Sequence, residues 1–92
     1  MRMGGKQNRI AEVIAEDGGI KYKYVLDELV NGERKTYSIG VYMKSKGEET
    51  SDYVEGIFAD KKRVIRVFYK ISRHLATPVN LRYVMEDEAL LI

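Results

Sequence analysis

The chain has no cysteine, no tryptophan, one proline and one histidine among its 92 residues. Without cysteine it can form neither a disulfide nor a thiolate metal site. No apolar run approaches the roughly 20 residues that a membrane-spanning helix needs. The segment 1–9 is polar and basic and no apolar stretch follows it, so we expect no signal peptide. These absences are typical of a cytoplasmic protein.

The composition indicates one soluble globular domain. Hydrophobic residues make up 45% of the chain and charged residues 33%, with a formal net charge of +2. That charge is too small to indicate a nucleic-acid partner by itself. Because Gly4 and Gly5 interrupt the polar start of the chain, we expect a flexible N-terminal arm over residues 1–9 and a single domain over 10–92.

An Asn31-Gly32 pair lies between two segments, 20–30 and 34–44, in which apolar and polar residues alternate. Asn-Gly between alternating segments is the strongest short-range signal of a β-hairpin. With Asn31-Gly32 as the loop, one face of the hairpin is apolar and the other is polar. The expected cross-strand pairs are Leu26 with Tyr37, Tyr24 with Ile39, Tyr22 with Val41, and Glu28 with Lys35 as an ion pair.

Two further strands are expected beside this hairpin. Residues 10–16 alternate and end at Gly18-Gly19, which as a two-residue loop places Ala15 opposite Tyr22 and Val13 opposite Tyr24. Residues 50–58, after a turn at Lys46-Gly47-Glu48-Glu49, form a weaker candidate for a fourth strand because Gly56 interrupts them and both of their faces are mixed.

The hydrophobic period changes to about 3.6 after residue 60, which predicts two helices. Asp60 is the expected N-cap of the first helix, which should end at Ala76. Thr77 is the expected N-cap of the second, with Pro78 at its first helical position. The apolar stripes are Val64, Val67, Phe68, Ile71 and Leu75 in the first helix, and Leu81, Val84, Met85 and Ala89 in the second.

These elements predict an α+β fold. We expect a three- to four-stranded antiparallel meander sheet with two C-terminal helices packed on its apolar face.

Two motifs carry a resemblance to a known family. They are Thr36-Tyr37-Ser38-Ile39 and the segment Thr77-Pro78-x-x-Leu81-x-x-Val84-x-Glu86-Asp87-x-x-Leu90. The chain resembles, over about residues 20–91, a family of short uncharacterised proteins of Gram-positive anaerobic bacteria, a domain of unknown function. The resemblance implies the same order of strands and helices and implies no activity.

Four basic residues of the first helix form the main candidate binding surface. Lys62, Arg66, Lys70 and Arg73, called the basic stripe below, are spaced to project from the side opposite the apolar stripe. An anionic partner, either a phosphate backbone or an acidic protein surface, would explain the pattern. A solvated helix face gives the same pattern without any partner.

Three other features could form a catalytic site, a metal site or a contact surface. His74 is the only histidine, and the sequence supplies no nucleophile or orienting acid for it, so we expect a structural role at the helix end. The acids Glu86, Asp87 and Glu88 point in different directions on a helix, so we expect no metal site there. We expect either fraying of the helix end or pairing with Arg82 or with a basic patch elsewhere. Tyr42, on the polar sheet face beside Lys21 and Lys23, is a second candidate contact surface.

The sequence contains no recognisable catalytic set, phosphate-binding glycine loop or metal-ligand spacing. We therefore expect a non-enzymatic protein without cofactor, metal or small-molecule substrate that acts as a protein-binding or regulatory accessory module. Self-association is expected, because a narrow sheet has exposed edges and Leu90-Leu91-Ile92 is apolar. The alternative is a nucleic-acid-associated regulator that uses the basic stripe.

Overall fold

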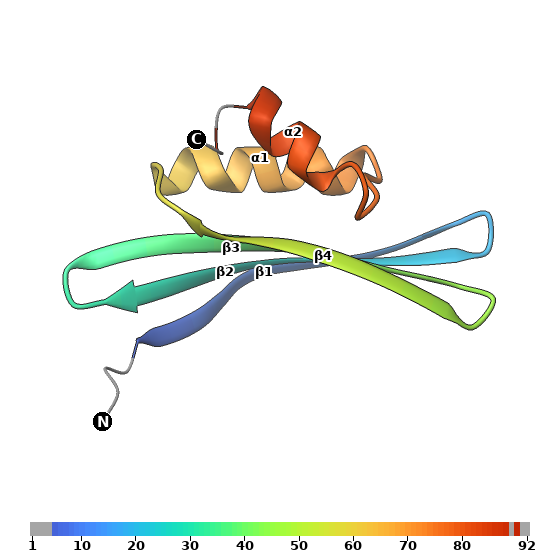
Figure 1. Ribbon diagram of the computed structural model, residues 1–92, viewed down its shortest axis with the longest axis horizontal. Coiled ribbons are helices and arrows are strands. Elements are labelled where there is room, and N and C mark those ends of the chain that lie inside the picture. The colour runs from blue at the N-terminus through green and yellow to red at the C-terminus, as the bar shows by residue number, and fades with distance from the viewer. Residues whose placement is uncertain (1–4, 89, 91–92) are drawn as a thin grey trace.

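A computed structural model describes residues 5–88 and residue 90. Its four strands form one antiparallel sheet in the order β1-β2-β3-β4, and both helices lie on the same side of that sheet (Figure 1). The elements are β1 Lys6–Asp17, β2 Ile20–Asn31, β3 Arg34–Ser45, β4 Glu48–Ile57, α1 Lys61–Arg73 and α2 Leu81–Asp87. The predicted α+β meander with two C-terminal helices on one face is confirmed, with four strands. Neither α1 nor α2 has the length and apolar character of a membrane-spanning helix.

The β1–β2 hairpin has the predicted loop and register. Ala15 lies opposite Tyr22 and Val13 opposite Tyr24, with Gly18 and Gly19 both at positive φ. The strand is longer than expected, since β1 begins at Lys6 and a bulge lies between Arg9 and Ala11. Residues 6–9 therefore pair with β2 and do not form part of an N-terminal arm.

The β2–β3 hairpin has the predicted faces and a different register. Its loop is Gly32-Glu33 rather than Asn31-Gly32, and Asn31 pairs with Arg34. Gly32 has φ +68, which is the conformation that a type II′ turn requires at its first central position. Each residue of β2 consequently lies opposite a residue two positions further along β3 than expected. The observed pairs include Leu26 with Ile39, Tyr24 with Val41, and Tyr22 with Met43. A shift of two residues leaves every side chain on its expected face, because side chains alternate with period two.

The predicted ion pair between Glu28 and Lys35 is wrong for the same reason. Glu28 lies opposite Tyr37, and Lys35 lies opposite Val30. Glu28 is buried and accepts a long hydrogen bond of 3.5 Å from the Tyr37 hydroxyl. Burial raises the pKa of Tyr37, and the nearby Glu28 carboxylate raises it further.

The fourth strand begins at Glu48, two residues earlier than expected, and pairs with β3 from a shorter loop at Lys46-Gly47 onwards. Ser45 lies opposite Glu48 and Gly40 opposite Tyr53. The register then shifts by one residue before Ile57, and Gly56 has φ +73 at this irregularity. Gly56 therefore lies at a bulge in the pairing of β3 with β4.

The core lies between the sheet and the helices. Tyr22, Tyr24 and Ile39 are buried, as expected for the helix-covered face. They pack with the buried stripe of α1, which is Val64, Val67, Phe68 and Ile71, and with Leu81 and Met85 of α2. Leu90 is also buried in this core, whereas Leu91 and Ile92 lie outside the described residues.

Helix α1 ends at Arg73, three residues before the expected Ala76. The Ala76 N–H donates to the Ile71 carbonyl and the Leu75 N–H to the Ser72 carbonyl, which is the Schellman arrangement. Leu75 has φ +54 at the position that glycine usually occupies, and its side chain packs against the core. The Tyr24 hydroxyl donates to the Ala76 carbonyl at 2.9 Å and so ties the end of α1 to the centre of the sheet.

Helix α2 begins later than expected. Its N-cap residue is Asn80 and its first helical residue is Leu81, so Thr77 is not the N-cap and Pro78 is not the first helical position. Instead the Thr77 carbonyl accepts from the Asn80 N–H, and this turn leads into the helix. Asp60 is the N-cap residue of α1 as predicted, without a side-chain capping bond. Ala89, expected in the stripe of α2, lies outside the described residues.

Candidate functional site

The face of the sheet that the helices leave uncovered is called the open face below. It carries large apolar and aromatic side chains that remain exposed in the described structure. Tyr42 is 45% exposed, Tyr53 55% and Ile14 72%. An exposed apolar group of this kind, rimmed by polar residues, is typical of an interaction surface.

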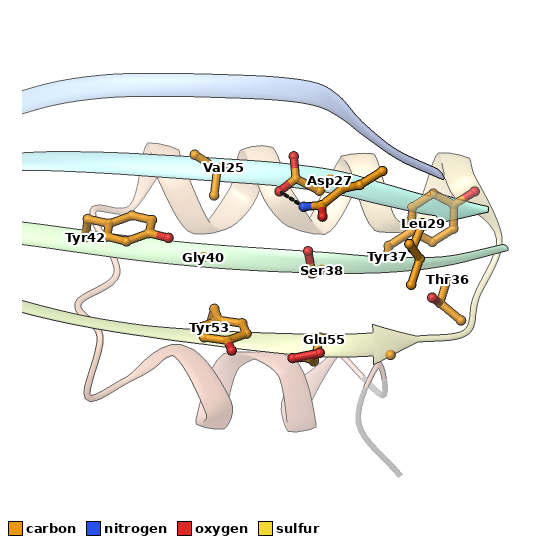
Figure 2. Close-up of a pocket in the computed structure, with 12 residues that line it drawn as sticks. Val25, Asp27, Leu29, Thr36, Tyr37, Ser38, Gly40, Tyr42, Tyr53 and Glu55 are labelled. Carbon is orange, nitrogen blue, oxygen red and sulfur yellow. Dashed lines mark hydrogen bonds between the residues drawn. The ribbon is translucent and has the colours of Figure 1, made fainter. Parts of the chain in front are cut away.

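Gly40 lies at the centre of the open face, and the surface is hollowed there. Figure 2 shows Val25 on the neighbouring strand β2, Tyr42 further along β3, and Tyr53 on β4 around this position. The depression, called the Gly40 hollow below, has a volume of about 440 Å³. A Cβ atom at residue 40 would lie 3.1 Å from Val25 Cγ2 and 3.3 Å from Tyr42 Cε1. Glycine therefore allows this close packing of neighbouring side chains and leaves the hollow open.

Asp27 lines one side of the Gly40 hollow and is only 8% exposed. Its carboxylate accepts a hydrogen bond from Arg9 Nε at 2.5 Å and another from Gln7 Nε2 at 3.1 Å. The hydrogen bond to Asp27 raises the pKa of Arg9. Because a buried carboxylate needs such partners, Arg9 and Gln7 fix the Asp27 side chain at the edge of the hollow.

A second depression of about 430 Å³ lies on the other side of Tyr42. Lys21, Lys23 and Lys44 line it together with Ile14, and Lys44 pairs with Glu49 at 3.7 Å. The open face thus has acidic side chains beside the Gly40 hollow and basic side chains towards the β1–β2 loop. Its charge is mixed along its length.

Comparison with protein families gave one match. Residues 6–89 match the profile of DUF6514, a family of unknown function. The chain belongs to this family. The expected membership of a family of unknown function is confirmed, and the match begins well before residue 20, where the resemblance was expected to start. Comparison with curated proteins and with solved structures found no significant match.

The basic stripe of this DUF6514 protein lies on α1, away from the open face. All four of its side chains are exposed, but Lys70 Nζ bonds to Glu88 Oε2 at 2.5 Å. Arg63, beside the stripe, donates to the Glu88 carbonyl at 2.6 Å. Lys70, with Arg63 and Arg66, holds the pKa of the Glu88 carboxyl below its usual value. Part of the positive charge is therefore used to hold the end of α2 against α1.

The acids at residues 86–88 do not form a common site. Glu88 pairs with Lys70 of the basic stripe, which is one of the alternatives expected for this cluster, whereas Arg82 pairs with Asp52. Among residues 5–88 and 90, no group of three or more histidine and carboxylate side chains is placed to bind a metal. His74 is the exposed C-cap residue of α1, on the helix side of the sheet and away from the Gly40 hollow.

The sequence placed Tyr42 on the open face, but it did not predict the hollow around Gly40. Tyr53 was not assigned to a face, although counting from the Lys46-Gly47 loop would have placed it opposite Gly40. The pairing of Asp27 with Arg9 depends on residues 6–9 being part of β1, which the polar sequence of that segment did not indicate.

Proposed function

We propose that this protein is a non-enzymatic, cytoplasmic accessory module that binds another protein through its open face. The observation that carries the proposal is the Gly40 hollow, with Tyr42 and Tyr53 exposed around a buried Val25. Tyrosine is enriched at protein interfaces because it combines a large apolar ring with a polar hydroxyl.

The charges on the open face favour a protein partner over a nucleic acid. Glu55 lines the Gly40 hollow, the Asp27 carboxylate there is paired with Arg9, and no lysine or arginine is among the described residues that line it. A phosphate group in the hollow would therefore meet a carboxylate and no basic side chain lining the hollow. A protein segment can place an apolar side chain over Gly40 and match the acidic and basic ends of the face separately. Such an anchor residue, seated in a preformed depression, is typical of interface hot spots.

The proposal is tested by removing the two exposed rings. Tyr42→Ser/Tyr53→Ser should reduce retention of the partner from an extract of the source cells by roughly tenfold or more, because hot-spot aromatics carry much of the binding energy. Retained proteins would be quantified by mass spectrometry, and the purified partner titrated by calorimetry. The melting temperature should change little, since both rings are about half exposed.

The matched control is Tyr69→Ser/Tyr83→Ser, which removes two exposed tyrosines from the helices. This control should retain the partner as the wild type does. If no protein distinguishes the sheet variant from the helix variant, the open face is not a protein-binding surface.

Nucleic-acid binding by the basic stripe is the second candidate function. The observation in its favour is that Lys62, Arg66 and Arg73 are exposed on the side of α1 opposite its buried stripe. The engagement of Lys70 with Glu88 weakens it. This candidate predicts that labelled RNA or DNA binds at low salt, that binding falls steeply as salt rises, and that Lys62→Glu/Arg66→Glu abolishes it.

Fluorescence anisotropy measures this binding directly. Lys70 is left unchanged in the test variant, because a charge reversal there would disrupt its contact with Glu88 and weaken the packing of α2 against α1. Lys35→Glu/Lys46→Glu, on the β2–β3 and β3–β4 hairpins, serves as the charge-matched control. This candidate function would be wrong if both variants lose nucleic-acid binding equally. It would also be wrong if the wild type binds no nucleic acid at low salt.

A further inference from the structure

The two edges of the sheet differ. At the β4 edge, Arg82 of α2 pairs with Asp52 and donates to the Tyr53 carbonyl at 3.3 Å, so a side chain occupies a backbone acceptor of the strand. The bulge at Gly56 further interrupts that edge. At the β1 edge, no side chain within residues 5–88 hydrogen-bonds to the backbone of the strand. A strand with an open row of backbone donors and acceptors can pair with another strand.

The apolar residues of β1 are incompletely covered. Ile10, Ala11, Val13 and Ala15 pack against the core and remain partly exposed. Helix α1 packs nearest to β2, and α2 packs nearest to β4, so no helix is centred over β1. A strand added beside β1 would bring further apolar side chains to this flank of the core.

The charges along β1 are ordered. Lys6 and Arg9 lie in its first half, and Glu12, Glu16 and Asp17 lie in its second half. A second β1 strand running antiparallel places its acidic half beside the basic half of the first. The same contact occurs twice, as two-fold symmetry requires. The strand is therefore complementary in charge to a copy of itself.

We propose that two copies of this chain pair antiparallel through β1 and form one continuous sheet. The register that fits best is centred on Val13, which then lies opposite Val13 of the second copy, with Ala11 opposite Ala15. A register centred on Glu12 would place two like charges opposite each other and is disfavoured. The pairing leaves the Gly40 hollows of both copies uncovered on the same side of the sheet. It is therefore independent of the function proposed for the open face.

The test is sedimentation velocity over a wide range of protein concentration. The wild type should sediment as a dimer that dissociates on dilution. Glu16→Lys/Asp17→Lys should weaken the dimer by roughly tenfold or more, because in the register centred on Val13 it places like charges beside Arg9 of the second copy.

Mixing the Glu16→Lys/Asp17→Lys variant with the wild type provides the decisive measurement. In this heterodimer one of the two contacts with Arg9 is again between opposite signs, so dimerisation should partly recover in the mixture. A variant that had simply misfolded would not recover. Glu48→Lys/Glu49→Lys, which makes the same charge change at the start of β4, should dimerise like the wild type.

Three results would overturn the proposal. These are a wild type that remains monomeric at the highest concentration, a mixture that does not recover, or an equal effect of the reversal at Glu48 and Glu49. Tyr42→Ser/Tyr53→Ser should still dimerise, so failure of the open-face function and failure of the β1 pairing are distinguishable.

Discussion

Replacing Phe68 by alanine should lower the free energy of unfolding by about 3 to 5 kcal/mol. Phe68 is fully buried on α1, where it joins the helix to the apolar face of the sheet. Removing the ring leaves a cavity between the two layers in addition to the lost burial. Since a small domain has roughly 5 to 15 kcal/mol of stability in total, the variant should be close to unfolding. Urea denaturation followed by circular dichroism measures the change.

The chain supplies a matched control, because it has only one other phenylalanine. Phe58 is 72% exposed between β4 and α1, with the Arg34 guanidinium 5.9 Å from its ring centre. Phe58→Ala removes the same atoms from a solvated position and should cost about 1 kcal/mol or less. Equal losses for the two variants would mean that α1 does not pack on the sheet through Phe68.

Replacing Tyr24 by phenylalanine should destabilise the protein at neutral pH and stabilise it, relative to the wild type, in strong base. At pH 8 the variant loses the hydrogen bond to the Ala76 carbonyl, which contributes about 1 kcal/mol. Burial raises the pKa of Tyr24 from 10.0 to about 12, and the neighbouring Tyr22 adds to the shift. Between these two values the unfolded chain releases the Tyr24 proton while the folded protein keeps it.

The wild type consequently loses stability as pH rises from the unfolded pKa to the folded pKa. The loss amounts to about 2 to 3 kcal/mol, at 1.36 kcal/mol for each pKa unit. The phenylalanine variant has no such proton, so the two stability curves should cross near pH 11. Urea denaturation of both proteins at intervals from about pH 8 to 12 measures the difference between their free energies of unfolding. Contributions of other titratable groups largely cancel in this difference. A difference that stays constant over this range would contradict the burial of the Tyr24 hydroxyl.

The faces of the sheet were predictable from the sequence, but the register of its central hairpin was not. Tyr22, Tyr24 and Leu26 lie on the same face of the sheet because side chains alternate with period two. They stay on the apolar face when the pairing of β2 with β3 changes by two residues. Loops at Asn31-Gly32 and at Gly32-Glu33 both use the glycine and both satisfy the alternation. The pattern therefore cannot distinguish them, and the structure uses the second.

The helix boundaries were missed for a different reason. Asp60 was identified correctly, whereas Thr77-Pro78 has the composition of a helix start and instead forms the turn before one. The early end of α1 requires Leu75 at positive φ, a conformation that its residue type does not suggest. Packing of Leu75 against the core and the bond from Tyr24 to Ala76 favour this end, and both are tertiary contacts.

The candidate site was only partly predictable because three strands build it. The polar face beside Tyr42 followed from one hairpin. To predict the Gly40 hollow, one must know how Val25 on β2, Gly40 on β3 and Tyr53 on β4 lie beside one another. An error in the register of either strand pair therefore prevents the prediction. The neutralisation of Lys70 depends on α2 folding back on α1, which no local pattern in the sequence specifies.

The order of the elements along the chain has a consequence for biosynthesis. All four strands precede both helices, and each strand pairs with its neighbour in sequence, so a sheet can form while the chain is still being made. The apolar face of this sheet, with its tyrosine and aliphatic side chains, then remains exposed to water until α1 and α2 leave the ribosome. The nascent chain is most prone to aggregate during this interval, and association of ribosome-bound chaperones should be strongest there.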